Sequence, residues 1–351
     1  MFAKRKKENR AKTETKEKWS AKSDKKKKTV LAFAVTVFLL IILFFVAVNT
    51  GSLSVGFGQL LSGLFVEYDP DVAAVYDLRF PRIFISLMAG AATAVSGVLF
   101  QAVLKNPLAD PGLIGISSGA AFLAVCMTAL FPAWYYFTPM AAFGGGVAAF
   151  FMVYCLSWKG GLSPLRIILT GVAVDAMFTG LSSIFSTMSG GDRTGVASIV
   201  EANITQKTWD DVSMLLPYVV AGLLLAILFA GECNLLGLED KTARGLGVDV
   251  NRTRIVISLI AVLLASISTA VAGAISFLGL IVPHIGRLFV GSDHKVLIPF
   301  SALAGAATFL LADTIGRTIA APYEVSAAVI MSVVGGPFFI LLLRRSKKYG
   351  N

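Results

Sequence analysis

Long apolar stretches separated by short polar ones dominate this chain. A helix needs about 20 mostly apolar residues to cross a bilayer, and ten stretches approach or reach that length. They lie near residues 29–49, 82–103, 113–131, 138–158, 165–187, 216–236, 254–275, 277–291, 297–313 and 325–343. The pattern therefore predicts an all-α integral membrane protein with about ten transmembrane helices.

A polar break joins the second and third stretches. Residues 104–115 read LKNPLADPGLIG, which places Pro and Gly inside an otherwise apolar region. Backbone that leaves the helix at membrane depth survives only where it is packed in protein or lines a water-filled cavity, and transporters place such breaks along the substrate path. The break therefore indicates transport. We take Asn106 and Pro107 in this break, and Pro283 in the later segment that resembles it, as candidate path residues.

The chain also resembles itself. Thr93-Ala94-Val95-Ser96-Gly97 recurs as Thr269-Ala270-Val271-Ala272-Gly273, and at the same offset Pro107 matches Pro283. With ten spans and both basic ends of the chain in the cytoplasm, the first copy starts on the outside and the second on the inside. Helices 2–5 and 7–10 are therefore predicted to form an inverted repeat, which in transporters builds a path between two halves.

Composition supports a membrane protein and shows where the charge lies. Of the 351 residues 56% are hydrophobic and 15% charged, with mean hydropathy +0.77, whereas soluble domains carry about 25% charged residues. Most of the net charge of +10 lies at the two ends of the chain. We predict a basic, disordered cytoplasmic tail over 1–28 and a cytoplasmic tail over 346–351, because basic clusters beside spans mark the cytoplasmic side.

These basic ends also bear on partners. Clusters of Lys and Arg beside a span attract anionic membrane lipid. No motif of a nucleic-acid-binding module accompanies them, so we expect no nucleic-acid partner.

Four arginines depart from the rule that positive charges stay on the cytoplasmic side. In the predicted topology Arg79, Arg82, Arg193 and Arg317 lie outside.

Six short segments occur in a fixed order along the chain: Arg79–Arg82 (RFPR), Asn106–Gly112 (NPLADPG), Gly279–Arg287 (GLIVPHIGR), Gly291–His294 (GSDH), Leu311–Asp313 (LAD) and Gly336–Phe339 (GPFF). Together they resemble the FecCD-type permeases of iron-siderophore, haem and vitamin B12 ABC importers, over roughly residues 30–345. The resemblance implies a BtuC-like permease fold, with residues 29–345 as one polytopic transmembrane domain.

The resemblance also implies partners. Two permease subunits, identical or different, enclose the path; two ATPase subunits bind on the cytoplasmic side and use ATP; a binding protein delivers the substrate from outside. The chain has no P-loop, HExxH or GxSxG motif, so we expect neither an enzyme nor a bound cofactor. The expected cargo is a ferric siderophore carried across a bacterial cytoplasmic membrane, with haem or cobalamin as the alternatives.

Two groups of residues acquire expected roles through the resemblance. Arg79, Arg82 and Arg317 would form salt bridges with the binding protein, for which the planar guanidinium group is suited; the alternative is that they only reach to the lipid interface. Residues 237–254 would form a loop that couples to the ATPase. In it Ala243, Leu246 and Val248 offer a small apolar face, and Gly245 and Gly247 supply a turn. An ordinary cytoplasmic loop is the other interpretation.

Asp175 lies among apolar residues of the fifth predicted helix, where a carboxylate is costly. It could face the path, pair with a polar neighbour or take part in proton coupling. His284 and His294 are too few and too scattered for a metal site. An ion-coupled secondary transporter is the rival function, but such a protein needs neither a coupling loop nor docking arginines.

Overall fold

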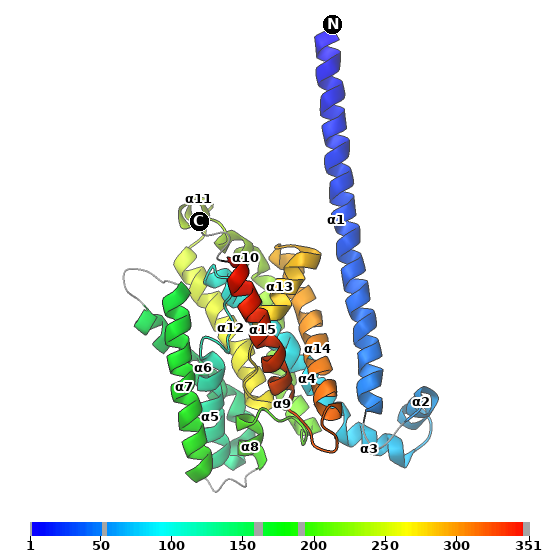
Figure 1. Cartoon of the computed structure of the whole chain (residues 1–351), viewed down its shortest axis with the longest axis vertical. Coiled ribbons are helices and arrows are strands. Elements are labelled where there is room, and N and C mark those ends of the chain that lie inside the picture. Colours follow the sequence, from blue (N-terminus) through cyan, green and yellow to red (C-terminus); the bar gives the residue numbers. More distant parts are fainter. Residues whose placement is uncertain (1, 51–54, 158–163, 189–193, 347–351) are drawn as a thin grey trace.

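The computed structural model describes residues 2–50, 55–157, 164–188 and 194–346. In these residues the elements are α1 (Phe2–Asn49), α2 (Phe57–Phe65), α3 (Pro70–Leu78), α4 (Phe80–Val103), α5 (Ile116–Leu130), the 3-10 helix η1 (Pro132–Phe137), α6 (Thr138–Ser157), α7 (Pro164–Met188), α8 (Thr194–Val200), α9 (Trp209–Leu228), α10 (Ala230–Leu236), α11 (Asp240–Gly245), α12 (Val250–Ala272), α13 (Leu278–Val290), α14 (His294–Thr318) and α15 (Ala327–Ser346). Figure 1 shows them as one bundle from which α1 projects.

The predicted class of fold is confirmed. Within the described part of the chain, eight helices are long and apolar enough to cross a bilayer, and α5 and α13 are shorter apolar helices. These ten follow the order of the ten predicted spans. Both short helices come directly after a break in the chain, so the break occupies part of the length that a continuous span would need.

The N-terminal segment differs from the expectation of a disordered tail over 1–28. The structure continues α1 as one helix from Phe2 to Asn49. Residues 2–28 contain no Gly or Pro and are rich in Lys, Glu and Ala, which favour helix. Because the helix is already nucleated by the apolar part that follows, these residues only have to extend it. The C-terminal tail over 346–351 lies outside the described residues except for Ser346.

The sixth predicted span, 216–236, is divided in the structure. Helix α9 begins earlier, at Trp209, because the Thr208 side chain and Asp211 form a capping box at its start. It ends at Leu228, and the separate helix α10 follows. The predicted span leaves out the first turn of α9, where Asp210 and Asp211 lie and where the helix dipole favours acidic residues.

Helices α4 and α12 form the centre of the bundle. They are the most enclosed of the long apolar helices and cross in opposite directions. Thr93 Oγ1 lies 2.9 Å from Ser268 Oγ, and Ser96 Oγ, one turn further along α4, donates to the Ala261 carbonyl, nearly two turns back along α12. This antiparallel crossing is the arrangement that an inverted repeat predicts.

The remaining contacts follow the same symmetry. Helix α4 packs on α14 and α13, whereas α12 packs on the corresponding α6 and α5 of the other half. Each half thus places its first helix against the second and third helices of its partner half. The two halves are therefore interlocked, and neither has a separate core.

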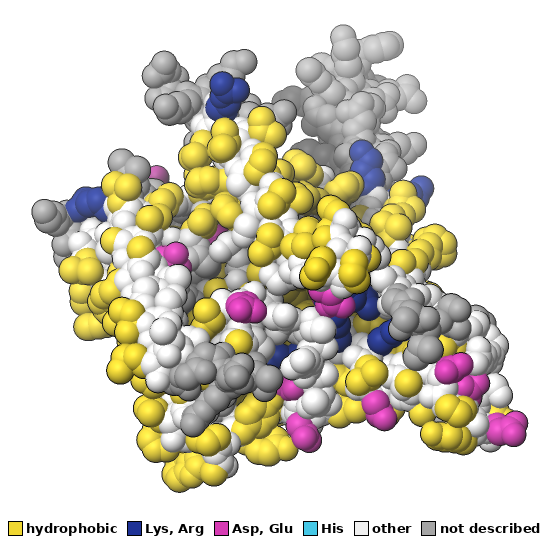
Figure 2. All heavy atoms as spheres, turned by 60° about the horizontal axis from the view of Figure 1, so that its bottom comes forward, with side chains coloured by type: hydrophobic (Ala, Val, Ile, Leu, Met, Phe, Trp, Pro, Cys, Tyr) yellow, Lys and Arg dark blue, Asp and Glu magenta, His cyan; other side chains and the backbone are white. Residues whose placement is uncertain are grey.

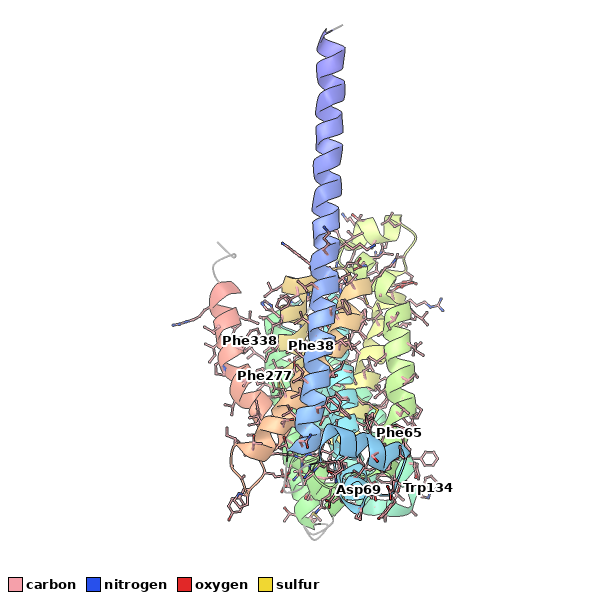
Figure 3. The ribbon with its side chains drawn as sticks, turned by 90° about the vertical axis from the view of Figure 1, so that its right-hand side faces the viewer. Phe38, Phe65, Asp69, Trp134, Phe277 and Phe338 are labelled. Atoms are coloured by element: carbon pink, nitrogen blue, oxygen red, sulfur yellow. The ribbon has the colours of Figure 1, made fainter. Side chains whose placement is uncertain are left out.

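The bundle has two ends with different chemistry. The end that carries α11 also holds both chain termini (Figure 1), and we call it the α11 end. The other, which we call the arginine end, carries Arg79, Arg82 and Arg317. Figure 3 shows Phe65, Asp69 and Trp134 near the arginine end. Phe65 and Trp134 are exposed there, as expected of aromatic side chains at a membrane interface.

A close contact between the two halves depends on a glycine. Gly97 in α4 lies directly against the backbone of Gly279 at the start of α13, and a Cβ on Gly97 would overlap the Gly279 carbonyl oxygen. Small residues at such crossings let two helix backbones approach closely.

Replacing Gly97 with Ala should therefore lower the free energy of unfolding by at least about 2 kcal/mol, because the obstructing atoms are backbone and cannot rotate away. Gly180→Ala in α7 is the matched control, since its Cβ meets open space and Ala is the better helix former by up to about 1 kcal/mol. Thermal unfolding of the purified protein in detergent compares them. Equal midpoints for the two variants would contradict the close contact.

Candidate functional site

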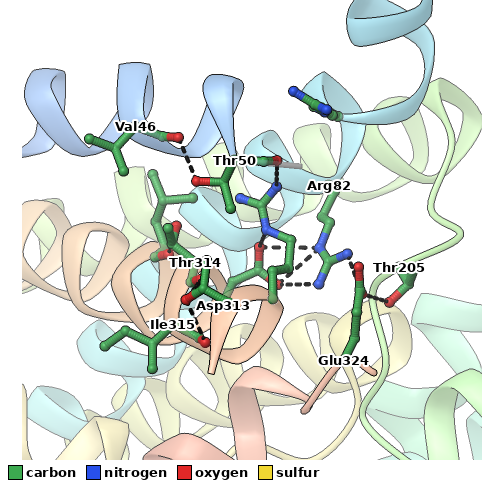
Figure 4. Close-up of polar contacts among 12 residues, drawn as sticks. Val46, Thr50, Arg82, Thr205, Asp313, Thr314, Ile315 and Glu324 are labelled. Carbon is green, nitrogen blue, oxygen red and sulfur yellow. Dashed lines mark hydrogen bonds and ion pairs between the residues drawn. The ribbon is translucent and has the colours of Figure 1, made fainter. Parts of the chain in front are cut away.

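The most polar buried cluster lies at the arginine end. Arg82, near the start of α4, is buried and binds Asp313 of α14 through two nitrogens, with Nε–Oδ1 at 3.0 Å and Nη2–Oδ1 at 2.9 Å. Its Nη1 donates to Glu324 Oε2 at 2.7 Å. Figure 4 shows the Arg82 guanidinium held between these two carboxylates. Such two-point pairing of arginine with a carboxylate is among the stronger polar interactions in proteins.

The other two arginines lie beside this pair. Arg317 Nε is 3.4 Å from Asp313 Oδ2, and Arg317 Nη1 donates to the Thr50 carbonyl at 3.4 Å. Its Nη2 is buried and has no hydrogen-bond partner. Arg79 donates through Nη1 to the Val48 carbonyl at 2.5 Å. The cluster thus contains three guanidinium groups and two carboxylates, so it carries an excess positive charge.

Local sequence explains how the cluster is assembled. Asp313 and Arg317 lie four residues apart on α14, and therefore on one helix face. Arg79 is the residue between α3 and α4, and Pro81 in the first turn of α4 fixes where that helix begins. Glu324 lies in the connection from α14 to α15 and also accepts a hydrogen bond from Thr205 at 2.8 Å. Four separate parts of the chain therefore meet at this point.

Glu324 remains ionised in this setting. Partial burial alone would raise its pKa, but the hydrogen bond and charge of Arg82 outweigh that effect, so the pKa of Glu324 lies below its ordinary value. Its side chain is 37% exposed, whereas that of Asp313 is 1% exposed. Figure 2, which turns the arginine end toward the viewer, shows basic side chains in the middle of this face with acidic ones around them.

The two breaks of the repeat meet in the middle of the bundle. Asp110, in the first break, is fully buried, and its Oδ1 accepts from the backbone N–H groups of Gly112 and Leu113. Its Oδ2 points toward Gly279, where the second break ends. Gln101 of α4 donates from Nε2 to the carbonyls of Ala109, at 3.3 Å, and Gly279, at 3.1 Å. One amide group thus binds the first break and the start of α13, directly after the second break.

The second break contains an aromatic residue with an unusual backbone. Residues 273–277 separate α12 from α13, and Phe277 has φ of +66°. Gly335 of α15 packs directly on the Cβ of Phe277. Figure 3 shows Phe277 and Phe338 at about half the height of the bundle, so this irregular backbone lies at membrane depth.

The candidate path residues are distributed around these breaks. Asn106 is buried, and its side chain accepts from the Leu108 N–H, so it shapes the local turn. Pro107 is exposed, and Pro283 is buried within α13. Asp175 is half-buried on α7, where its backbone lies against Gly115 and its carboxylate lies beside Ser118. These four residues do not form one cluster.

The expected coupling loop forms the α11 end. The short helix α11 precedes the turn of this loop, and the long helix α12 begins soon after the turn, at Val250. Ala243 is buried and holds the loop to the bundle, and Val248 is half-buried. Gly245, Leu246 and Gly247 are exposed, with Leu246 the large apolar side chain among them. Gly247 has φ of +85° and provides the turn.

The sequence analysis did not identify the acidic residues that pair with the basic side chains at the two ends of the bundle. Asp313 lies in one of the quoted motifs, and its four-residue spacing from Arg317 was the available signal. The ion pairs that Asp240 makes near the start of α11 were also missed. Arg193 lies outside the described residues. Among the residues that the structure describes, no three His, Cys, Asp or Glu side chains are grouped to hold a metal ion.

Comparisons with known proteins agree with this geometry. The family model of the FecCD transport family matches residues 39–345. Two relatives from Staphylococcus aureus, of strains MSSA476 and Newman, are named "Probable heme-iron transport system permease protein IsdF". Each is 38% identical over 324 residues, which cover 92% of this chain and 98% of the relative.

Two solved structures share the fold. A protein described as a metal-chelate type ABC transporter, in an inward-facing conformation, aligns with a TM-score of 0.73 and 24% identity over 90% of this chain and 99% of that one. PsaBC from Streptococcus pneumoniae, in complex with a Fab, aligns with a TM-score of 0.57 and 17% identity over 82% and 95%.

The different burial of the two carboxylates predicts different costs of removing them. Asp313→Asn should destabilise the protein by about 3 kcal/mol, because it leaves two buried guanidinium groups short of a counter-charge. Glu324→Gln, at a more exposed position, should cost less than about 1 kcal/mol. Thermal unfolding in detergent measures both, and a larger loss in Glu324→Gln would refute the assignment of Asp313 as the main counter-ion.

Proposed function

Because this chain belongs to the FecCD transport family, it is an ABC-importer permease for iron chelate or haem, and we propose that its cargo is haem. The observation that carries this choice is the 38% identity, over nearly the whole chain, to relatives named as heme-iron permeases. The sequence alone favoured a ferric siderophore, which is the second candidate because the family includes such importers. Cobalamin is the third.

The path is proposed to pass beside the meeting point of the two breaks. Irregular backbone at membrane depth is tolerated where it is packed or lines a cavity, and in transporters it marks substrate sites. Asn106 and Pro107 belong to the first break, Pro283 lies in α13 after the second, and Asp175 lies beside Gly115 at the end of the first break. A second permease subunit, identical or different, would close the path.

The α11 end is proposed to face the cytoplasm. It holds both termini, and the basic residues near each terminus favour the cytoplasmic side. The exposed residues Gly245, Leu246 and Gly247, with the half-buried Val248, would contact a separate ATPase subunit, while the buried Ala243 anchors the loop. ATP would be hydrolysed there, and this chain would bind no cofactor. The chain would lie in the cell membrane, with anionic lipid beside the basic residues at its two ends.

The arginine end is then the proposed docking face for a substrate-binding protein. Arg79, Arg82 and Arg317 together exceed the charge of Asp313 and Glu324, so an added carboxylate would balance the cluster. Arg82 is fully engaged within the chain, whereas Arg317 Nη2 lacks a partner. We therefore expect docking to rearrange the cluster, with the incoming carboxylate bound by Arg317 and Arg79.

Uptake measurements test the cargo. Cells with and without this chain are given labelled haem, a labelled ferric siderophore or labelled cobalamin. Loss of ATP-dependent haem uptake alone supports the proposal, and loss of siderophore uptake alone replaces haem with the second candidate. Uptake that persists when ATP is depleted but follows an ion gradient would point to a secondary transporter and would overturn the proposed function.

Charge reversal tests the docking face. Arg79→Glu should weaken capture of the loaded binding protein, and the loss should shrink as ionic strength rises, because the interaction is electrostatic. Asp71→Asn is the control, since it changes charge on the exposed surface in the first turn of α3, about two turns before Arg79. Binding is measured on the permease in nanodiscs. An affinity that Arg79→Glu leaves unchanged at low salt would refute the docking role.

A further inference from the structure

A single carboxylate at the α11 end joins three parts of the chain. Asp240, the first residue of α11, lies with its Oδ1 at 3.0 Å from Lys105 Nζ and at 2.8 Å from Arg254 Nη2. Lys105 Nζ also donates to the Leu238 carbonyl at 2.6 Å. Lys105 follows α4, and Arg254 lies in the second turn of α12. Asp240 therefore links α11 to the start of the first break in one half of the repeat and to α12 in the other half.

Each of these two basic residues is connected along the chain to one of the breaks. Lys105 has φ of +48° and belongs to the first break, five residues before the buried Asp110. Arg254 lies near the start of α12, and this rigid helix ends at the second break, residues 273–277. The two breaks touch where Gly112 lies against Ile275, and Gln101 and Asp110 link the first break to Gly279, just after the second.

Apart from the ion pairs of Asp240 and the buried Ala243, the tip of the loop makes little contact with the bundle. Gly245 and Gly247 face open space, and Leu246 is exposed. Single exposed ion pairs contribute little, but here two cations share one carboxylate. The hydrogen bond from Lys105, together with the charge of Arg254, holds the pKa of Asp240 below its ordinary value. The three charged groups thus act together.

We propose that Asp240 is a positioning residue which, through Lys105 and Arg254, transmits movement of loop 237–254 to both breaks of the transmembrane bundle. The inference rests on the proposed function, since it requires an ATPase that moves the loop. Without the two ion pairs, the loop would still bind the ATPase, but its movement would no longer be passed on efficiently to the path.

The test measures haem transported per ATP hydrolysed, with the complete transporter and its binding protein in proteoliposomes. Asp240→Asn should keep the ATPase bound and hydrolysing while this ratio falls about fivefold, a size typical of coupled residues. Lys105→Gln should lower the ratio in the same direction, and Lys105→Arg, which keeps the charge, should retain it. A purely structural role would instead lower the yield of assembled transporter and leave the ratio unchanged.

Two further variants make the result decisive. Lys295→Gln removes an exposed positive charge at the same end without touching Asp240, and it should leave the ratio unchanged. The double variant Lys105→Gln with Asp240→Asn should be no worse than Asp240→Asn alone, because both act through one interaction. Unchanged ratios in both single variants, or additive losses in the double variant, would overturn the inference. If the wild type itself moves no haem in this assay, the proposed cargo fails, and the same ratios are then measured with a ferric siderophore.

Discussion

Inside a bilayer, backbone that leaves the helix has to find its hydrogen-bond partners within the protein, because hydrocarbon offers none. The structure meets this constraint by bringing its two breaks together. Gly112 of the first break lies against the Ile275 carbonyl of the second. Gln101 binds the carbonyl of Ala109 in the first break and that of Gly279 just after the second, and Asp110 accepts from the backbone of its own break. The contact requires Gly97 where the backbones approach. The central, antiparallel placement of α4 and α12 follows, since these helices carry the chain into the breaks.

The sequence was a good guide to features that repeat or interrupt a pattern. Ten spans, the Pro-Gly break and the internal repeat were all readable, because hydropathy and Gly or Pro act locally. Long-range pairs were not readable: Arg82 and Asp313 are 231 residues apart, and nothing local joins them. Helix ends that depend on side-chain capping, such as the start of α9, were misplaced for a similar reason.

Charge is used differently at the two ends of the molecule. At the arginine end, Arg82 and Asp313 are almost completely buried, so their interaction is shielded from salt. At the α11 end, Lys105, Asp240 and Arg254 are each about one-third exposed and remain accessible to water and ions. The Arg82–Asp313 pair is thus little affected by ionic strength, whereas the ion pairs of Asp240 are weakened by salt and lie where another subunit can reach them.

The backbone of Phe277 gives the second break a bias of its own. A bulky residue with positive φ stores about 1–3 kcal/mol of strain, which the surrounding packing has to offset. Any rearrangement that returns this residue to negative φ recovers that free energy. A release of about 1.4 kcal/mol shifts a two-state equilibrium tenfold. The strain at Phe277 therefore favours conformations of the second break in which this residue has negative φ.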